Sequence, residues 1–423
     1  MIPMKSYLKL FHVLQLVLLG AVYSSFALGA NSDPKISRQF LYATSNSASG
    51  NSVVGYKVGR AGNLDSLPGS PFSTFGLGQG VTLLVSSDSG LVASEDNRFL
   101  FVPNRGSNDI AVFRIRPDGT LASVSGSPFP SGGITPTSLA ISGDTLFVAH
   151  SGLGLFLNCT DCDYRGFRVS ESGRLTPIEG SYVKLSESPP SGPLAIRFSP
   201  DGKFLFGTEL VSGKINVYKF NHDAEPGKAV LTPAPGSPFM ANDKLPLGFN
   251  FNPNNPTQLF ISNVGLTANS GSVSPFLIAN SGQISPIGEA VTSGQSATCW
   301  INLTHDGKWL FATNTNSDTV SSFGVAADGR LSLVDTTALP NDSIQTNKSL
   351  AAVDMAMTSG DEYLYVLTRI VPAITGFKIG TDGKLAPISS VKFNIPDAVP
   401  FGLVHVDLGK SKARQESHEK EKD

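Results

Sequence analysis

Short runs of alternating hydrophobic and polar residues recur along the chain, and each is bounded by turn residues. A typical pair is Phe204-Leu205-Phe206 followed by Ile215-Asn216-Val217-Tyr218. The first hydrophobic runs of successive units lie at 40–42, 99–102, 146–148, 204–206, 259–261, 309–311 and 363–366. Their length and residue types are typical of β-strands. Seven repetitions predict one repeated supersecondary unit that accounts for most of the chain.

A glycine turn keeps step with these strands. It has the form polar-Gly-polar-Leu, as in Asp118-Gly119-Thr120-Leu121, and its glycines lie at 62, 119, 173, 227, 282, 329 and 383. A tight hairpin turn needs a positive φ, which glycine adopts without strain. The regular spacing therefore predicts a hairpin at the same point of every unit.

The repeat indicates an all-β, seven-bladed β-propeller with four antiparallel strands in each blade. A unit of about 50 residues with four short strands has the size of a propeller blade. A sandwich or an open sheet would leave long exposed edges, which proteins avoid. In three units the outer strand ends in Gly-Ser-Pro-Phe, at 69–72, 126–129 and 236–239. Proline is tolerated there because an edge strand does not need that N–H group.

The two ends of the repeat predict how the ring closes. The first blade begins at Phe40 without an innermost strand like that at 194–198, whereas the segment 401–406 resembles an innermost strand. We expect this C-terminal segment to pair beside residues 40–45 and to close the ring. The propeller then spans 39–408.

The segments outside the propeller predict export. Lys5 and Lys9 precede an apolar stretch that ends in small residues, with cleavage expected after Ala27 or Ala30. We interpret 1–30 as a signal peptide, the alternative being an uncleaved membrane anchor. No further membrane span is expected in the mature chain, and 409–423 is expected to be a disordered charged tail. The exported chain would then be extracellular, with N-linked glycans at Asn158, Asn341 and Asn347. A fourth sequon at Asn302 lies on a predicted buried strand.

Charge and motifs exclude several functions. The net charge is −2, and no long basic run occurs in the propeller, which argues against a nucleic-acid partner. Neither a dinucleotide fingerprint nor a phosphate, calcium or haem motif is present, so we expect no cofactor and no metal. Cys159 and Cys162 fall in a long insertion, and export favours a local disulfide or pairing elsewhere over a zinc site. Cys299 is then a buried free thiol. The sequence leaves the oligomeric state open.

Several segments resemble the lactonase-type seven-bladed propellers, which include bacterial 6-phosphogluconolactonases and fungal 3-carboxymuconate cyclases. The resemblance covers about 39–408, and the segments that carry it are 101–108, 198–206, 299–301 and 306–314. It implies a small lactone or carboxylate as substrate, with ring opening or the reverse cyclisation as the reaction. The last of these segments resembles a secreted branch of the family.

The resemblance also implies where catalytic groups are expected, and this sequence departs from that pattern. The family has a histidine near Pro136, Arg-His after Pro193 and an arginine after Asn314. Here Thr137, Leu194-Ala195 and Thr315 occupy those positions. The glutamate of the fourth blade is retained as Glu209.

The remaining candidates for chemistry are charged or titratable residues near strand ends. His150 and Glu209 end equivalent strands of blades 3 and 4, and we predict an acid–base pair where the ring axis meets one face. Arg197 and Arg105 are predicted to bind an anionic substrate group, with Arg369 a third candidate. The alternative for each is a structural role in an ion pair or a loop.

Two classes of function follow. The first is a secreted lactone hydrolase or cycloisomerase that acts on a small carboxylated substrate. The second is a non-catalytic extracellular glycoprotein that binds a ligand or partner through one propeller face. The retained Glu209 favours the first class, and the replaced histidine and arginine positions favour the second.

Overall fold

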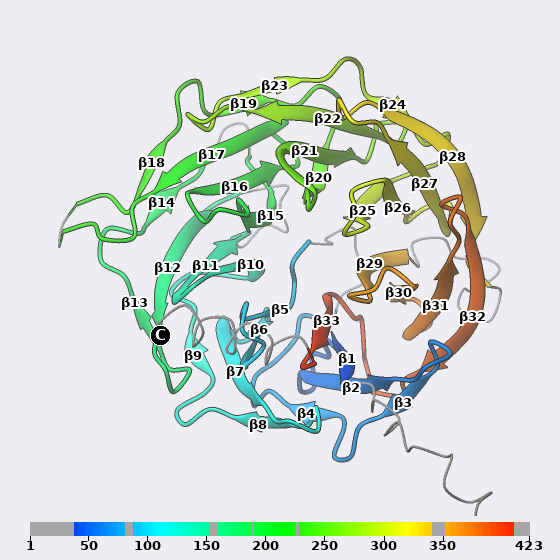
Figure 1. Ribbon diagram of the computed structural model, residues 1–423. Coiled ribbons are helices and arrows are strands. Elements are labelled where there is room, and N and C mark those ends of the chain that lie inside the picture. Colours follow the sequence, from blue (N-terminus) through cyan, green and yellow to red (C-terminus); the bar gives the residue numbers. More distant parts are fainter. Residues whose placement is uncertain are drawn as a thin grey trace, which may run out of the picture. The chain divides into compact units, whose positions relative to one another are not determined.

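Seven antiparallel sheets are arranged as blades around one axis (Figure 1). The computed structural model describes residues 38–80, 88–152, 159–187, 190–225, 228–340 and 352–409. All regular elements in these ranges are strands. The described residues contain no helix long and apolar enough to cross a membrane. The predicted signal peptide, nearly all of the predicted tail and the three predicted glycan acceptors lie outside the described residues.

The strands fall into ranks according to their distance from the axis. The innermost rank contains β33 (Leu403–Asp407), β5 (Val92–Ala93), β10 (Pro136–Ser142), β15 (Pro193–Phe198), β20 (Pro246–Asn252), β25 (Thr298–Leu303) and β29 (Ala352–Met357). The second rank contains β1 (Gln39–Thr44), β6 (Phe99–Asn104), β11 (Thr145–His150), β16 (Phe204–Glu209), β21 (Asn255–Asn263), β26 (Trp309–Asn314) and β30 (Tyr363–Thr368). The third rank contains β2 (Ser52–Val58), β7 (Asp109–Ile115), β12 (Asp163–Val169), β17 (Lys214–Phe220), β22 (Ser272–Ile278), β27 (Thr319–Val325) and β31 (Ala373–Ile379).

The outer rank differs between blades. It contains β3 (Leu64–Ser66), β8 (Leu121–Ser123), β13 (Leu175–Pro177), β18 (Leu231–Pro233), β23 (Ile284–Pro286), β28 (Leu331–Ala338) and β32 (Leu385–Lys392). Five blades add a short fifth strand to this edge, namely β4 (Phe72–Ser73), β9 (Phe129–Pro130), β14 (Val183–Lys184), β19 (Phe239–Met240) and β24 (Val291–Thr292). The prediction of four strands per blade is therefore met in blades 6 and 7 and exceeded in the other five.

In four of these five blades a Gly-Ser segment precedes the extra strand; in the blade of β23 and β24 the residues are Gly288-Glu289. This segment interrupts the outer strand, so that both halves pair separately with the third strand, as β3 and β4 do with β2. At the interruption a serine hydroxyl replaces the missing carbonyl. Ser70, Ser127 and Ser237 accept hydrogen bonds from ladder N–H groups at 2.8–3.0 Å. The Gly-Ser-Pro-Phe repeats thus mark a break in the edge rather than the end of a strand.

The C-terminal strand closes the ring, as predicted. β33 pairs antiparallel with β1, with Leu403 opposite Ala43 and Asp407 opposite Gln39. The first blade is therefore built from both ends of the propeller.

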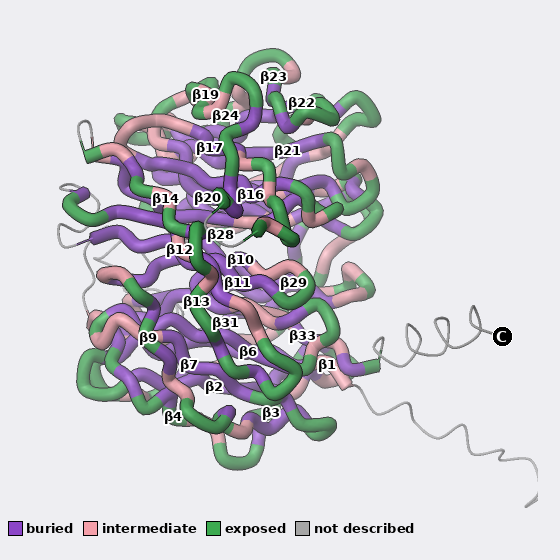
Figure 2. Tube along the Cα trace, turned by 90° about the vertical axis from the view of Figure 1, so that its left-hand side faces the viewer, coloured by how far each residue is buried: buried purple, intermediate pink, exposed green. Residues whose placement is uncertain are grey.

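Contacts between blades explain why the glycine turns and the aromatic strand starts recur together. In the six described turns the glycine has φ between +77° and +90°. A side chain at Gly119 would overlap the Phe40 ring of the preceding blade, and one at Gly62 would overlap Tyr363, across the closure. At both positions an aromatic ring of the neighbouring blade packs directly against the glycine turn. The buried strands lie between turns that are exposed at both faces (Figure 2).

Blade 2 departs from the repeat near the axis. Its innermost strand, β5, is two residues long, and residues 88–91 bond to other blades instead. The Asp88 N–H donates to the Leu194 carbonyl at 3.0 Å, and the Leu139 N–H donates to the Ser89 carbonyl at 3.0 Å. This axial segment, residues 88–91, brings a carboxylate to the centre of the ring.

Candidate functional site

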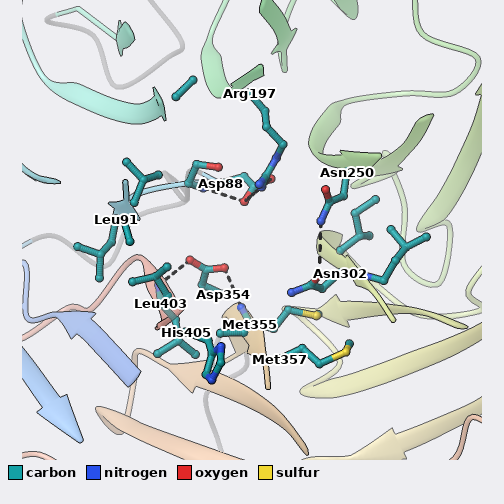
Figure 3. A pocket seen from close by; sticks show the side chains of 18 of the residues that line it. Asp88, Leu91, Arg197, Asn250, Asn302, Asp354, Met355, Met357, Leu403 and His405 are labelled. Atoms are coloured by element: carbon teal, nitrogen blue, oxygen red, sulfur yellow. Dashed lines mark hydrogen bonds and ion pairs between the residues drawn. The ribbon is translucent and has the colours of Figure 1, made fainter. Parts of the chain in front are cut away.

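A cavity of about 480 Å³ lies at the ring axis, and we call it the axial cavity (Figure 3). Its wall comes from the later residues of the innermost strands β10, β15, β20, β25 and β29, from the start of β33 and from the axial segment. Its polar groups include Asp88, Arg197, Asp354, Asn250 and Asn302. These groups come from five different places in the chain, which the ring brings together.

Asp88 is held by two neighbouring blades. One of its carboxylate oxygens lies 3.3 Å from Nη2 of Arg197, on β15. The same oxygen accepts the N–H of Phe249, on β20, at 3.3 Å. Ser89 donates its N–H to the other oxygen at 2.7 Å. The carboxylate is nearly buried, and these hydrogen bonds fix its position.

Arg197 keeps unused hydrogen-bonding capacity. About a third of its side chain is exposed, which leaves it accessible from the cavity. Its Nε atom is buried and has no hydrogen-bond partner among the residues that the structure describes. A buried donor without a partner is costly, and the exposed part of the same side chain is what a ligand in the cavity could contact.

Asp354, on β29, is the second buried carboxyl group of the cavity wall. Its oxygens accept the N–H groups of Met355 at 2.7 Å and Leu403 at 2.8 Å. Burial, with a further contribution from the charge of Asp88, raises the pKa of Asp354 well above its usual range. The two carboxyl groups therefore have different environments, one facing a guanidinium group and one favouring a bound proton.

The rest of the wall is largely apolar. It includes Leu91, Ile301, Met355, Met357 and Leu403. Asn250 donates to Asn302 at 3.4 Å on one side of the cavity. His305 also lines it and pairs with Asp361 at 2.6 Å. The axial cavity thus has a polar cluster, formed by Asp88, Arg197 and Asp354, next to a hydrophobic surface.

The predicted acid–base residue His150 lies elsewhere, at the end of β11. It is fully buried, and its Nδ1 lies 2.7 Å from Oδ1 of Asp163. The other oxygen of Asp163 pairs with Arg165 at 3.0 Å. Nε2 of His150 has no partner among the described residues. His150 is one end of a buried His-Asp-Arg chain and does not line the axial cavity.

Glu209 occupies the equivalent end of β16 in the next blade. One of its carboxylate oxygens accepts a hydrogen bond from Asn216 at 2.8 Å, and the other accepts one from Ser212. Burial, with the nearby charge of Glu209, raises the pKa of the Tyr164 hydroxyl. His150 and Glu209 thus lie at matching strand ends, as predicted from the repeat, but each is bound by residues of its own blade.

The two predicted anion-binding arginines are separated. Arg197 lines the axial cavity, whereas Arg105 follows β6 and is fully buried. Arg105 donates to the Thr137 carbonyl at 3.3 Å and lies 4.5 Å from the centre of the Phe401 ring. Burial lowers the pKa of Arg105 to about 9. Arg369 lies 5.9 Å from the centre of the same ring, so both arginines take part in packing around Phe401.

The three cysteines form one disulfide and one buried free thiol. Cys159 and Cys162 form a disulfide, and burial raises the pKa of the free Cys299 thiol to about 11. Within the described ranges, no group of three or more His, Cys, Asp or Glu residues could hold a metal ion.

Sequence reasoning missed Asp88 and Asp354. Asp354 had a usable signal, because it is a lone acidic residue within the apolar run Val353-Asp354-Met355 of an innermost strand. Asp88 had none, because its position depends on the axial segment leaving its own blade.

Comparison with known proteins agrees with this fold. The family model described as "Lactonase, 7-bladed beta-propeller" matches residues 66–152 and 246–339. A "putative 6-phosphogluconolactonase" from Bacteroides fragilis has 20% sequence identity and a TM-score of 0.68, with 89% of this chain and 99% of that chain covered. A periplasmic gluconolactonase from Pseudomonas aeruginosa has 20% identity and a TM-score of 0.65, with 87% and 98% covered. No curated protein matches the chain in sequence.

These findings confirm the resemblance that the sequence predicted. The chain is a seven-bladed β-propeller, and parts of its sequence resemble the lactonase family of such propellers. At 20% identity, the likeness to the solved structures establishes the fold alone.

Proposed function

We propose that this protein hydrolyses small lactones in the axial cavity. The observation that carries the proposal is the placement of Asp88, Arg197 and Asp354 together in one cavity within a lactonase-like fold. Acid–base catalysis commonly uses two carboxyl groups whose environments differ, so that one of the two groups is protonated and the other is charged.

The residues have distinct roles in this proposal. Asp88 accepts a proton from the attacking water as the oxygen of that water bonds to the lactone carbonyl carbon. The guanidinium group of Arg197 stabilises the negative charge that develops on the carbonyl oxygen. Asp354 donates its proton to the ring oxygen as the acyl–oxygen bond breaks. The product is the open hydroxy acid, and proton exchange with solvent restores both carboxyl groups.

The predicted pair His150 and Glu209 supports a structural role better than a catalytic one. Both side chains are buried and hydrogen-bonded within their blades, and neither lines the axial cavity. We therefore place the reaction in the cavity.

Export is part of the proposal. Three features support it: the N-terminal apolar segment, the Cys159–Cys162 disulfide and the periplasmic location stated for the Pseudomonas aeruginosa gluconolactonase. Disulfides persist mainly in oxidising compartments. We infer a secreted glycoprotein whose substrate is an extracellular lactone.

One observation favours the second class of function, a partner-binding propeller. Large apolar side chains are exposed beside the loops near the ends of the second-rank strands, among them Phe75, Tyr182, Met240 and Leu266. Such side chains are typical of interaction surfaces.

The test is lactone turnover by the purified protein, followed by acid release at constant pH. Asp88→Asn keeps the shape of the side chain and removes its charge, so we expect turnover to fall by about 100-fold or more. Asp96→Asn is the matched control, because Asp96 is half-exposed and lies outside the cavity wall. If the wild type opens no lactone, or if Asp88→Asn retains full activity, the hydrolase proposal is wrong and partner binding becomes the better account.

A further inference from the structure

We infer that the axial cavity selects lactones with an uncharged, apolar substituent and rejects phosphorylated sugar lactones. This inference rests on the proposed function and names the substrate class of the same site.

The charges in the cavity wall disfavour a phosphate. Arg197 is the one arginine or lysine among the described residues that line the cavity, and it already faces Asp88. Glu95 adds a further carboxyl group to the same wall. Phosphate sites in proteins use several cationic or N–H donors at once. A phosphate dianion here would meet one shared guanidinium group and two carboxylates, those of Asp88 and Glu95, which repel it.

The histidines of the wall do not supply the missing cations. His305 lies 2.6 Å from a carboxylate oxygen of Asp361, so its charge when protonated is already matched. His405 lies 3.0 Å from the side-chain oxygen of Gln39. His305 therefore brings no unmatched positive charge, and His405 is hydrogen-bonded to a neighbouring amide.

The remaining wall suits a hydrocarbon group. Leu91, Met355, Met357 and Leu403 lie near Asp88 and Arg197 (Figure 3). Ile301 also lines the cavity, and the five residues come from four separate segments. Methionine side chains are flexible and adapt to substituents of different shape. With the lactone carbonyl at Arg197, an alkyl substituent can lie against this surface. Each buried methylene is then worth roughly a fourfold gain in kcat/KM.

The experiment compares three probes with the purified full chain: γ-decalactone, glucono-δ-lactone and 6-phosphoglucono-δ-lactone. Spontaneous opening is subtracted in each case. We expect kcat/KM for γ-decalactone to exceed that for the phosphorylated lactone by about 100-fold or more. Equal or faster opening of 6-phosphoglucono-δ-lactone would overturn the inference while leaving the proposed hydrolase function intact.

A charge variant gives an independent check. Met357→Lys places a cation in the apolar wall, so we expect kcat/KM for γ-decalactone to fall about tenfold and that for the phosphorylated lactone to rise. Met240→Lys makes the same change at an exposed position outside the cavity and should alter neither value. A Met357→Lys variant that folds normally but shows unchanged preference contradicts the assigned wall.

Binding separates the two proposals if no turnover occurs. Titration calorimetry with γ-decalactone and with 6-phosphogluconate shows which ligand the cavity prefers. Tighter binding of the alkyl lactone without turnover retains the specificity and discards the hydrolase function. Binding of neither ligand discards both.

Discussion

Asp354 is buried, accepts two backbone hydrogen bonds and has a neighbouring carboxylate, that of Asp88. The hydrogen bonds favour its charged form, but burial and Asp88 outweigh them, so that its pKa is raised. A buried carboxyl group whose pKa is raised on folding also makes the free energy of unfolding depend on pH.

The first prediction follows from the sign of that shift. Because the pKa of Asp354 is higher in the folded than in the unfolded chain, its contribution to stability is complete at low pH. It is lost as the pH rises through the folded value. Asp354→Asn cannot ionise, so its free energy of unfolding should decline less from about pH 4 to about pH 9. Urea unfolding at a series of pH values measures this, and parallel curves for the two proteins would contradict it.

The second prediction concerns Glu209, whose two carboxylate oxygens accept hydrogen bonds from Asn216 and Ser212. Glu209→Gln turns one acceptor into a donor that faces another donor. We expect kcat/KM to stay within about twofold and the free energy of unfolding to fall by about 1–3 kcal/mol. Glu179→Gln, at an exposed position, is the control for stability. A large loss of turnover without loss of stability would return Glu209 to the catalytic role predicted from sequence.

At the scale of elements, the glycine turn and the aromatic strand start form a joint between blades. The carbonyl of Gly119 also accepts the Tyr42 hydroxyl at 2.6 Å, and that of Gly62 accepts the Tyr365 hydroxyl at 2.9 Å. The same contact therefore occurs between the consecutive blades 1 and 2 and between blades 7 and 1, where the ring closes.

The third prediction tests this joint with two alanine substitutions. Gly119 and Gly288 both have positive φ, but a side chain at Gly119 overlaps the Phe40 ring, whereas one at Gly288 meets open space. Gly288→Ala should cost about 1 kcal/mol of stability, from backbone strain alone. Gly119→Ala should cost a further 1–3 kcal/mol or so, from overpacking. Denaturant unfolding measures both, and equal losses would show that the joint contributes nothing.

Elements predicted from local patterns were found, and those that depend on distant contacts were not. The alternating hydrophobic runs and glycine turns depend on neighbouring residues, so strands such as β6 and β16 match the sequence pattern closely. The split outer strands were missed because Ser70, Ser127 and Ser237, which stand at three of the breaks, accept hydrogen bonds from residues 15 to 20 positions away in the sequence. The axial segment was missed because the hydrogen bond between Asp88 and Arg197 joins residues that are 109 positions apart in the sequence.

The candidate site shows the same division. Arg197 was predicted because it lies on the innermost strand of the fourth blade and could bind a carboxylate. His150 and Glu209 were placed correctly at matching strand ends, but sequence could not reveal that Asp163, Asn216 and Ser212 already bind them.

At the scale of the whole molecule, closure by β33 makes the axial cavity a product of the entire chain. Leu403 both begins the closing strand and donates its N–H to Asp354. The proposed catalytic acid is thus held in place by the strand that completes the ring.

The fourth prediction concerns export. In a eukaryotic host the secreted protein should begin at Leu28 or Asn31, and enzymatic removal of glycans should lower its apparent mass. Replacing Asn158, Asn341 and Asn347 by Gln should abolish that decrease. Asn302→Gln should not, because Asn302 lies half-buried on β25 in the cavity wall. Secreted protein with an intact N-terminus or an unchanged mass would contradict the proposal.

The central claim is that lactone hydrolysis takes place in the axial cavity with Asp354 as the proton donor. The most direct measurement is kcat/KM of the wild type and of Asp354→Asn for the same lactone, with thermal unfolding recorded for both. A folded Asp354→Asn variant should lose about 100-fold or more in kcat/KM, because the leaving ring oxygen no longer receives a proton. Equal values for the two folded proteins would contradict the account.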